Sequence, residues 1–106
     1  MVTIKINNLE DYQKKFKIEK DAIYLLTMND CRFCKLMKKE WKKAKNKNKN
    51  INIYEIESKL FKTNKVSKNI SKFLFYYPTI LKYNGKNTKI FENDRNVNNF
   101  DNFIKN

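Results

Sequence analysis

Two cysteines, Cys31 and Cys34, are the residues of this chain whose type and spacing suggest covalent chemistry. They are the only cysteines among 106 residues, and the chain has no histidine. The apolar run at residues 22–28 is typical of a buried strand, and residues 35–45 repeat apolar side chains at helical spacing. A thiol at a helix start ionises more readily, because the macrodipole and the unpaired N–H groups favour the thiolate. The pattern predicts a redox site in which Cys31 is the exposed, readily ionised thiol and Cys34 is shielded.

A metal site is the first alternative for this pair. A zinc ion in proteins has about four ligands, so two cysteines without histidine cannot complete a zinc site in one chain. Zinc or an iron–sulfur cluster shared between two chains remains open, as does a pair of inert buried cysteines. A structural disulfide across so short a loop would constrain the unfolded chain little. We expect no bound cofactor and no metal.

The net charge of +13 raises the question of an acidic partner. Phosphate neutralisation would give affinity for nucleic acid, but the basic residues are dispersed apart from the run at 42–49. Lysine, asparagine and isoleucine also dominate together, as A+T-rich coding would produce. We therefore expect no specific nucleic-acid partner.

The location of the protein is predicted from its apolar segments. The longest of these, residues 22–28, is far shorter than a membrane span, so no membrane partner is expected. Residues 1–6 alternate like a strand and lack the apolar core of a signal peptide. Two closely spaced cysteines suit a reducing compartment. We expect a cytoplasmic protein, from a microbe or from a virus acting in the host cytosol or the virion.

Hydrophobic periodicity and turn residues predict one α/β domain over residues 1–106, in the order βαβαβαββα. The first strand, residues 1–6, is expected near a sheet edge, and Asn8 is expected to cap the first helix. The only proline, Pro78, should open the fourth strand, and Asn84-Gly85 predicts a hairpin. The remaining expected elements are a third strand at 51–56, a loop and helix within 58–73, a return strand at 87–91 and a last helix at 96–105.

Two motifs in this order, Cys31-Arg32-Phe33-Cys34 and Tyr77-Pro78-Thr79, resemble those of the thioredoxin superfamily, in particular the catalytic modules of thioredoxin and protein-disulfide isomerase. The resemblance covers nearly the whole chain. It implies a thioredoxin fold, with a mixed central sheet flanked by helices. It also implies a thiol–disulfide oxidoreductase that acts on protein disulfides, in a direction set by the reduction potential of the cysteine pair.

The resemblance also implies residue roles. Cys31 matches the attacking cysteine and Cys34 the resolving one, and Arg95 matches an arginine that swings towards the resolving cysteine and lowers its pKa. Pro78 matches a cis-proline packed against the pair, and the backbone before it pairs with the substrate. The residues expected to contact substrate are Tyr77, Pro78, Arg32 and Phe33.

The chain also departs from these modules. The buried carboxylate that lies six residues before their first cysteine is Leu25 here, and the proline that kinks their second helix is Lys39. A glutaredoxin-like reductase, which also lacks that carboxylate, is therefore an alternative, although the Gly-Gly pair that holds glutathione is missing. A thioredoxin-fold binding module without turnover is another. The expected partners are proteins bearing disulfides or dithiols, with a reductase or a small thiol as electron donor, and the protein is expected to be a monomer.

Overall fold

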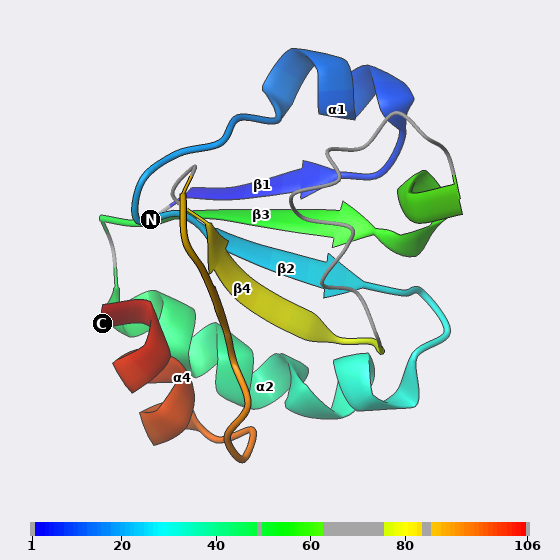
Figure 1. Cartoon of the computed structure of the whole chain (residues 1–106). Helices are drawn as coiled ribbons and strands as arrows, with labels where there is room; N and C mark the ends of the chain where they lie inside the picture. Colours follow the sequence, from blue (N-terminus) through cyan, green and yellow to red (C-terminus); the bar gives the residue numbers. More distant parts are fainter. Residues whose placement is uncertain (1, 49, 63–75, 84–85, 106) are drawn as a thin grey trace.

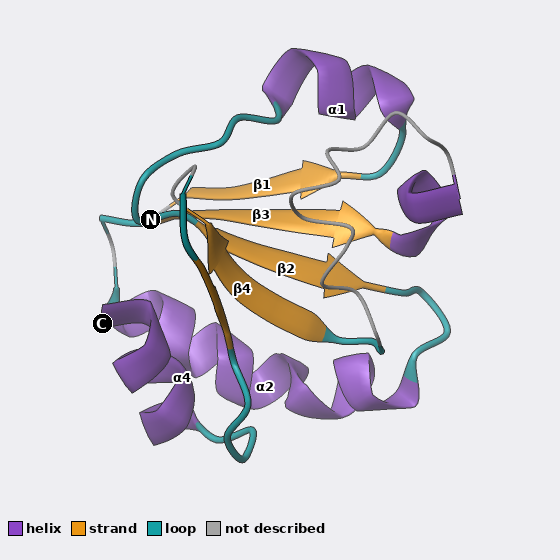
Figure 2. Ribbon diagram, viewed as in Figure 1, coloured by secondary structure: helices purple, strands orange, loops and turns teal. Residues whose placement is uncertain are grey.

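The computed structural model describes residues 2–48, 50–62, 76–83 and 86–105 of the chain. A five-stranded sheet has helices on both faces (Figures 1 and 2). In chain order the elements are β1 (Val2–Ile6), α1 (Leu9–Lys15), β2 (Ile23–Thr27), α2 (Arg32–Lys47), β3 (Asn52–Glu57), the 3-10 helix η1 (Ser58–Lys62), β4 (Thr79–Tyr83), β5 (Thr88–Ile90) and α4 (Val97–Lys105).

The strands lie in the order β1-β3-β2-β4-β5, so β2 is central and β1 is an edge, as the sequence predicts. β1, β3 and β2 are mutually parallel, whereas β4 pairs antiparallel to β2 and β5 antiparallel to β4. Thr27 at the end of β2 pairs with Glu57 at the end of β3, and Leu26 pairs with Thr79 at the start of β4. The segments leaving β2 and β3 and the segment entering β4 therefore meet at one end of the sheet.

One face of the sheet packs against α1 through aromatic rings. Asn8 caps α1 as predicted, because its side chain accepts a hydrogen bond from the Asp11 N–H at 2.8 Å. The rings of Tyr24 and Tyr54, from neighbouring strands, stack with their centroids 5.3 Å apart. The Tyr24 hydroxyl donates to the Lys17 carbonyl at 2.8 Å and accepts from the Glu19 N–H at 2.9 Å. These bonds tie the segment after α1 to the central strand.

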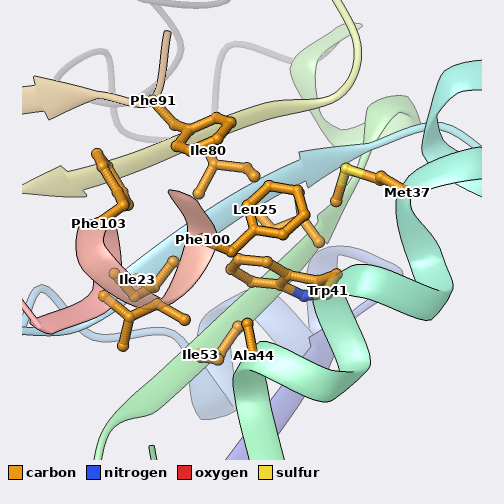
Figure 3. Close-up of a cluster of buried hydrophobic side chains, with 11 residues drawn as sticks. Ile23, Leu25, Met37, Trp41, Ala44, Ile53, Ile80, Phe91, Phe100 and Phe103 are labelled. Atoms are coloured by element: carbon orange, nitrogen blue, oxygen red, sulfur yellow. The ribbon is translucent and has the colours of Figure 1, made fainter. Parts of the chain in front are cut away.

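The opposite face packs against α2 and α4, as Figure 3 shows. The ring of Trp41 on α2 meets the ring of Phe100 on α4 edge to face, with centroids 5.2 Å apart. The buried side of α2 confirms the helical stripe predicted for residues 35–45. The buried side chains of this face are Ile23, Leu25, Met37, Trp41, Ala44, Ile53, Ile80, Phe91, Phe100, Phe103 and Ile104.

Some predicted boundaries differ from the structure. α2 begins at Arg32, beside the cysteine pair as predicted, and is uninterrupted at Lys39, but it continues to Lys47, beyond the predicted stripe at 35–45. The predicted helix within 58–73 is represented by the 3-10 turn η1, and its remainder lies outside the described residues, as does the predicted Asn84-Gly85 turn. The return strand is shorter than predicted, because β5 covers only Thr88–Ile90.

Candidate functional site

The cysteine pair lies where the chain leaves the central strand and enters α2. Cys31 is the N-cap residue of this helix, and its Sγ accepts a hydrogen bond from the Cys34 N–H at 3.0 Å. The Cys31 carbonyl accepts the Lys35 N–H at 3.1 Å, so the helical hydrogen bonding starts at this residue. Both thiols are free. A backbone donor therefore points at one sulfur from the positive end of a 16-residue helix.

The relative exposure of the two cysteines is the reverse of the prediction. Cys31 is only 4% exposed, whereas Cys34 is half-buried. The physical reason is the cap geometry, because the Cys31 side chain turns back over the first helical turn to accept the Cys34 N–H. The role of Cys31 therefore depends on this hydrogen bond and on the helix start rather than on exposure.

The surroundings of the Cys34 thiol favour its protonated form. Burial raises the pKa of the Cys34 thiol, a hydrogen bond to Cys31 raises it further, and smaller opposing contributions come from the Thr27 side chain and the Met28 backbone. A thiol must lose its proton before it attacks a disulfide. Cys34 therefore needs a proton acceptor to react near neutral pH.

The segment before β4 reaches the same end of the sheet. The Tyr77–Pro78 peptide bond is cis, and β4 begins at the next residue, Thr79, whose hydroxyl donates to the Tyr76 carbonyl at 2.5 Å. Burial raises the pKa of the Tyr77 phenol, followed by the nearby charges of Glu57 and Cys34. Tyr77, which the sequence predicts as part of a substrate-pairing segment, therefore lies within electrostatic range of Cys34.

A cavity of about 310 Å³ lies beside this segment, and its lining joins Tyr76 and Pro78 to residues 91–95. Arg95 belongs to this lining, and its guanidinium carbon lies 5.5 Å from the centroid of the Phe33 ring. In the structure Arg95 therefore stacks on Phe33, the residue before Cys34. The resemblance predicts that this arginine swings towards Cys34 itself. Both side chains are exposed, as is Arg32 at the start of α2.

A second cavity, of about 290 Å³, lies on the inner side of Cys34. Leu25, Thr27 and Glu57 are among the residues that line it with Cys34. Glu57 is only 5% exposed. The sequence reasoning missed this carboxylate because it ended the third strand at residue 56. The signal was present in the period-two alternation, which places 53, 55 and 57 on one face of the strand.

Two further properties bear on the function. Within the described ranges, the chain has no group of three or more histidine, cysteine or acidic side chains placed to hold a metal ion. None of the helices in that part of the structure is long and apolar enough to span a membrane.

Comparison with known proteins identifies the fold. No family model and no curated protein matches the sequence. Among solved structures, human ERp44 in its zinc-bound form matches with a TM-score of 0.59 and 16% sequence identity. The match covers 95% of this chain and 30% of the ERp44 chain, so the protein spans under a third of that structure. The chain has a thioredoxin fold, in which a Cys-x-x-Cys pair begins the second helix.

Proposed function

We propose that this protein catalyses thiol–disulfide exchange with protein substrates through Cys31 and Cys34. The observation that carries the proposal is the hydrogen bond from the Cys34 N–H to Cys31 Sγ at the start of α2. A hydrogen bond to an ionised acceptor is about twice as strong as one between neutral groups. The Cys34 N–H is a backbone donor aimed at Cys31 Sγ, the sulfur that acts as the nucleophile in the proposed exchange.

The reaction has two displacement steps. The Cys31 thiolate attacks one sulfur of a substrate disulfide, forms a mixed disulfide and releases the other sulfur as a thiolate. Cys34 then loses its proton and attacks Cys31 Sγ, which breaks the mixed disulfide and releases the second substrate thiolate. Two electrons pass from the protein dithiol to the substrate, and a small thiol or a reductase restores the dithiol.

Access to the site favours an extended polypeptide as substrate. The cis Tyr77–Pro78 segment borders the cavity of about 310 Å³, and Arg95 in the lining of that cavity contacts the ring of Phe33, the residue before Cys34. Large apolar side chains are exposed here, including Phe33 (57%) in the first turn of α2 and Tyr76 (49%) before Pro78. Apolar surface next to a reactive sulfur suits an unfolded or loosely folded protein segment.

Reduction of insulin by dithiothreitol tests the proposal. The parent protein should accelerate precipitation of the insulin chains, and Cys31→Ser, which changes one atom, should return the rate to that of dithiothreitol alone. Thermal unfolding of Cys31→Ser provides the control, because an unchanged melting temperature shows that the fold is intact. A parent protein that gives no acceleration would instead be a binding module, and a fully active Cys31→Ser would disprove the assignment of the nucleophile.

A further inference from the structure

A buried carboxylate lines the same cavity as Cys34. Glu57, the last residue of β3, is 5% exposed, and its Oε1 accepts a hydrogen bond from the Ser58 hydroxyl at 2.7 Å. Within the described part of the chain no lysine or arginine nitrogen lies within 4.0 Å of its oxygens. Glu55, two residues earlier, is different because its carboxylate pairs with Lys45 at 3.4 Å. Burial of a charge is costly, so a buried carboxylate with no cationic partner among the described residues is a candidate for a functional group.

The register of the sheet brings Glu57 towards Cys34. Thr27 lines the same cavity as Cys34 and lowers the pKa of its thiol, and Thr27 is the residue of β2 that pairs with Glu57. Paired residues on adjacent strands lie about 5 Å apart. Cys34 and Glu57 line the same cavity of about 290 Å³, which is large enough for several water molecules. The charges of Glu57 and Cys34 both raise the pKa of the Tyr77 phenol, so both groups lie within electrostatic range of that side chain.

We infer that Glu57 is the proton acceptor for Cys34 in the second step of exchange, directly or through one water in this cavity. The inference rests on the proposed function. Leu25 lines the same cavity and has no group that could accept a proton. Glu57 would therefore supply, from the end of β3, the base that β2 does not provide.

The step balances as follows. The Cys34 Sγ–H proton moves to a Glu57 carboxylate oxygen, and the sulfur lone pair forms the Cys31–Cys34 bond. The bond between Cys31 and the substrate sulfur breaks, and its electron pair leaves on the substrate thiolate. Glu57 then returns its proton to that thiolate or to solvent.

Several other charged or titratable groups face the cavity or the carboxylate, and they could also affect the pH dependence. Lysines from β1 and α2 outnumber the acidic groups, so the surroundings of Glu57 are net positive. These groups are Lys5, Cys34, Lys35, Lys38, Glu55 and Tyr77.

The reaction of the reduced protein with 5,5′-dithiobis(2-nitrobenzoate) in a stopped-flow instrument separates the two steps. The first burst of thionitrobenzoate reports attack by Cys31, and its rate depends on reagent concentration. The second burst reports attack by Cys34 and is independent of concentration, because it is intramolecular. Glu57→Gln should leave the first burst unchanged and slow the second about 100-fold near pH 6.5, the lower end of what general-base catalysis contributes. The difference should shrink at alkaline pH, where hydroxide removes the Cys34 proton.

Two matched variants serve as controls. Glu55→Gln removes the same charge from the same face of β3 and should leave the second burst unchanged. Glu57→Asp keeps a carboxylate and should lie between Glu57→Gln and the parent. If Glu57→Gln fails to fold, as judged by circular dichroism, Glu57→Asp decides: slowing of the second burst alone supports the inference, and no slowing overturns it.

The outcomes separate this inference from the proposed function. A second burst in Glu57→Gln that matches the parent across the pH range overturns the role of Glu57 and leaves thiol–disulfide exchange standing. Equal slowing in Glu55→Gln also overturns it, because the effect would then be one of general charge. A parent protein without a fast first burst would disprove the proposed function itself.

Discussion

Cys31 caps α2 with its sulfur, whereas the N-cap residue of a helix usually accepts the backbone N–H with a side-chain oxygen. Asn8 makes the ordinary bond at the start of α1, where its Oδ1 accepts the Asp11 N–H at 2.8 Å. Cys31 repeats the arrangement at the start of α2, with Sγ accepting the Cys34 N–H at 3.0 Å. A cap normally stabilises the helix by satisfying a free donor. Here the same bond also fixes the position of the sulfur that we propose as nucleophile.

Trapping of the mixed disulfide tests the division of roles between the cysteines. Cys34→Ser should accumulate a covalent complex with a disulfide-bearing protein, because the second displacement has lost its nucleophile. Cys31→Ser should form none, although Cys34 remains. Non-reducing electrophoresis with and without dithiothreitol gives the measurement. A complex formed by Cys31→Ser alone would assign the attack to Cys34.

Arg95 has to exchange one contact for another if it assists Cys34. Its guanidinium lies 5.5 Å from the Phe33 ring centroid, and an arginine close to a thiol would favour the thiolate. We expect Arg95→Gln to slow the resolution of the mixed disulfide, and Phe33→Leu, which frees the arginine, to leave it as fast or faster. The second burst of the stopped-flow experiment measures both variants. Resolution in Arg95→Gln at the parent rate would make Arg95 a surface charge.

At the scale of elements, Tyr24 joins β2 to the segment that follows α1. Tyr24→Phe would leave the Lys17 carbonyl and the Glu19 N–H without this partner, which should lower the free energy of unfolding by about 1–3 kcal/mol. Urea unfolding at neutral pH measures the change. An unchanged midpoint would mean that water replaces the hydroxyl without cost.

The same residue sets a pH dependence of stability. Burial is the main cause that raises the pKa of Tyr24 from 10.0 to about 12. Between these values the folded protein retains a proton that the unfolded chain loses, so stability should fall as the pH rises through this window. Tyr24→Phe should show a shallower decline in urea midpoint over this range, since one of the responsible phenols is removed. A decline as steep as that of the parent would assign the effect to other groups.

Periodicity and cap residues predicted most of the fold, because these signals are local. The Asn8 cap, the edge position of β1 and the buried centre at β2 are all confirmed. The helix start beside the cysteine pair is also confirmed, because α2 begins at Arg32 with Cys31 as its cap. The sequence signal for the loop and helix predicted within 58–73 is weak, because apolar residues are sparse there. Of this region the structure describes η1.

The candidate site was predicted in outline but not in its interior. The resemblance to thioredoxin modules predicted that Pro78 lies near Cys31 and Cys34, and the two motifs do flank β2 and β4, which pair in the sheet. The exposure of Cys31 and the contact of Arg95 with Phe33 depend on side-chain directions, which spacing does not encode. Glu57 was missed because the predicted third strand ended at residue 56, one residue short of β3.

For the molecule as a whole, the charge of +13 should affect encounter rather than chemistry. Charges separated by more than about 10 Å are screened at 0.1 M salt. Reduction of an acidic protein substrate should therefore slow as salt rises, whereas reduction of a neutral small disulfide should not. Initial rates over a sodium chloride series test this expectation. Equal salt dependence for both substrates would refute it.

The only tryptophan, Trp41, lies two helical turns after Cys34, about 10 Å along α2. Its ring is 97% buried, its Nε1 has no hydrogen-bond partner among the described residues, and it lines the same cavity as Cys34 and Glu57. A buried indole emits at shorter wavelength than an exposed one, and a thiolate formed nearby quenches it. The unlabelled protein should therefore carry its own fluorescent indicator: intensity would follow ionisation and oxidation of the dithiol, and a red shift would follow the separation of α2 from the sheet.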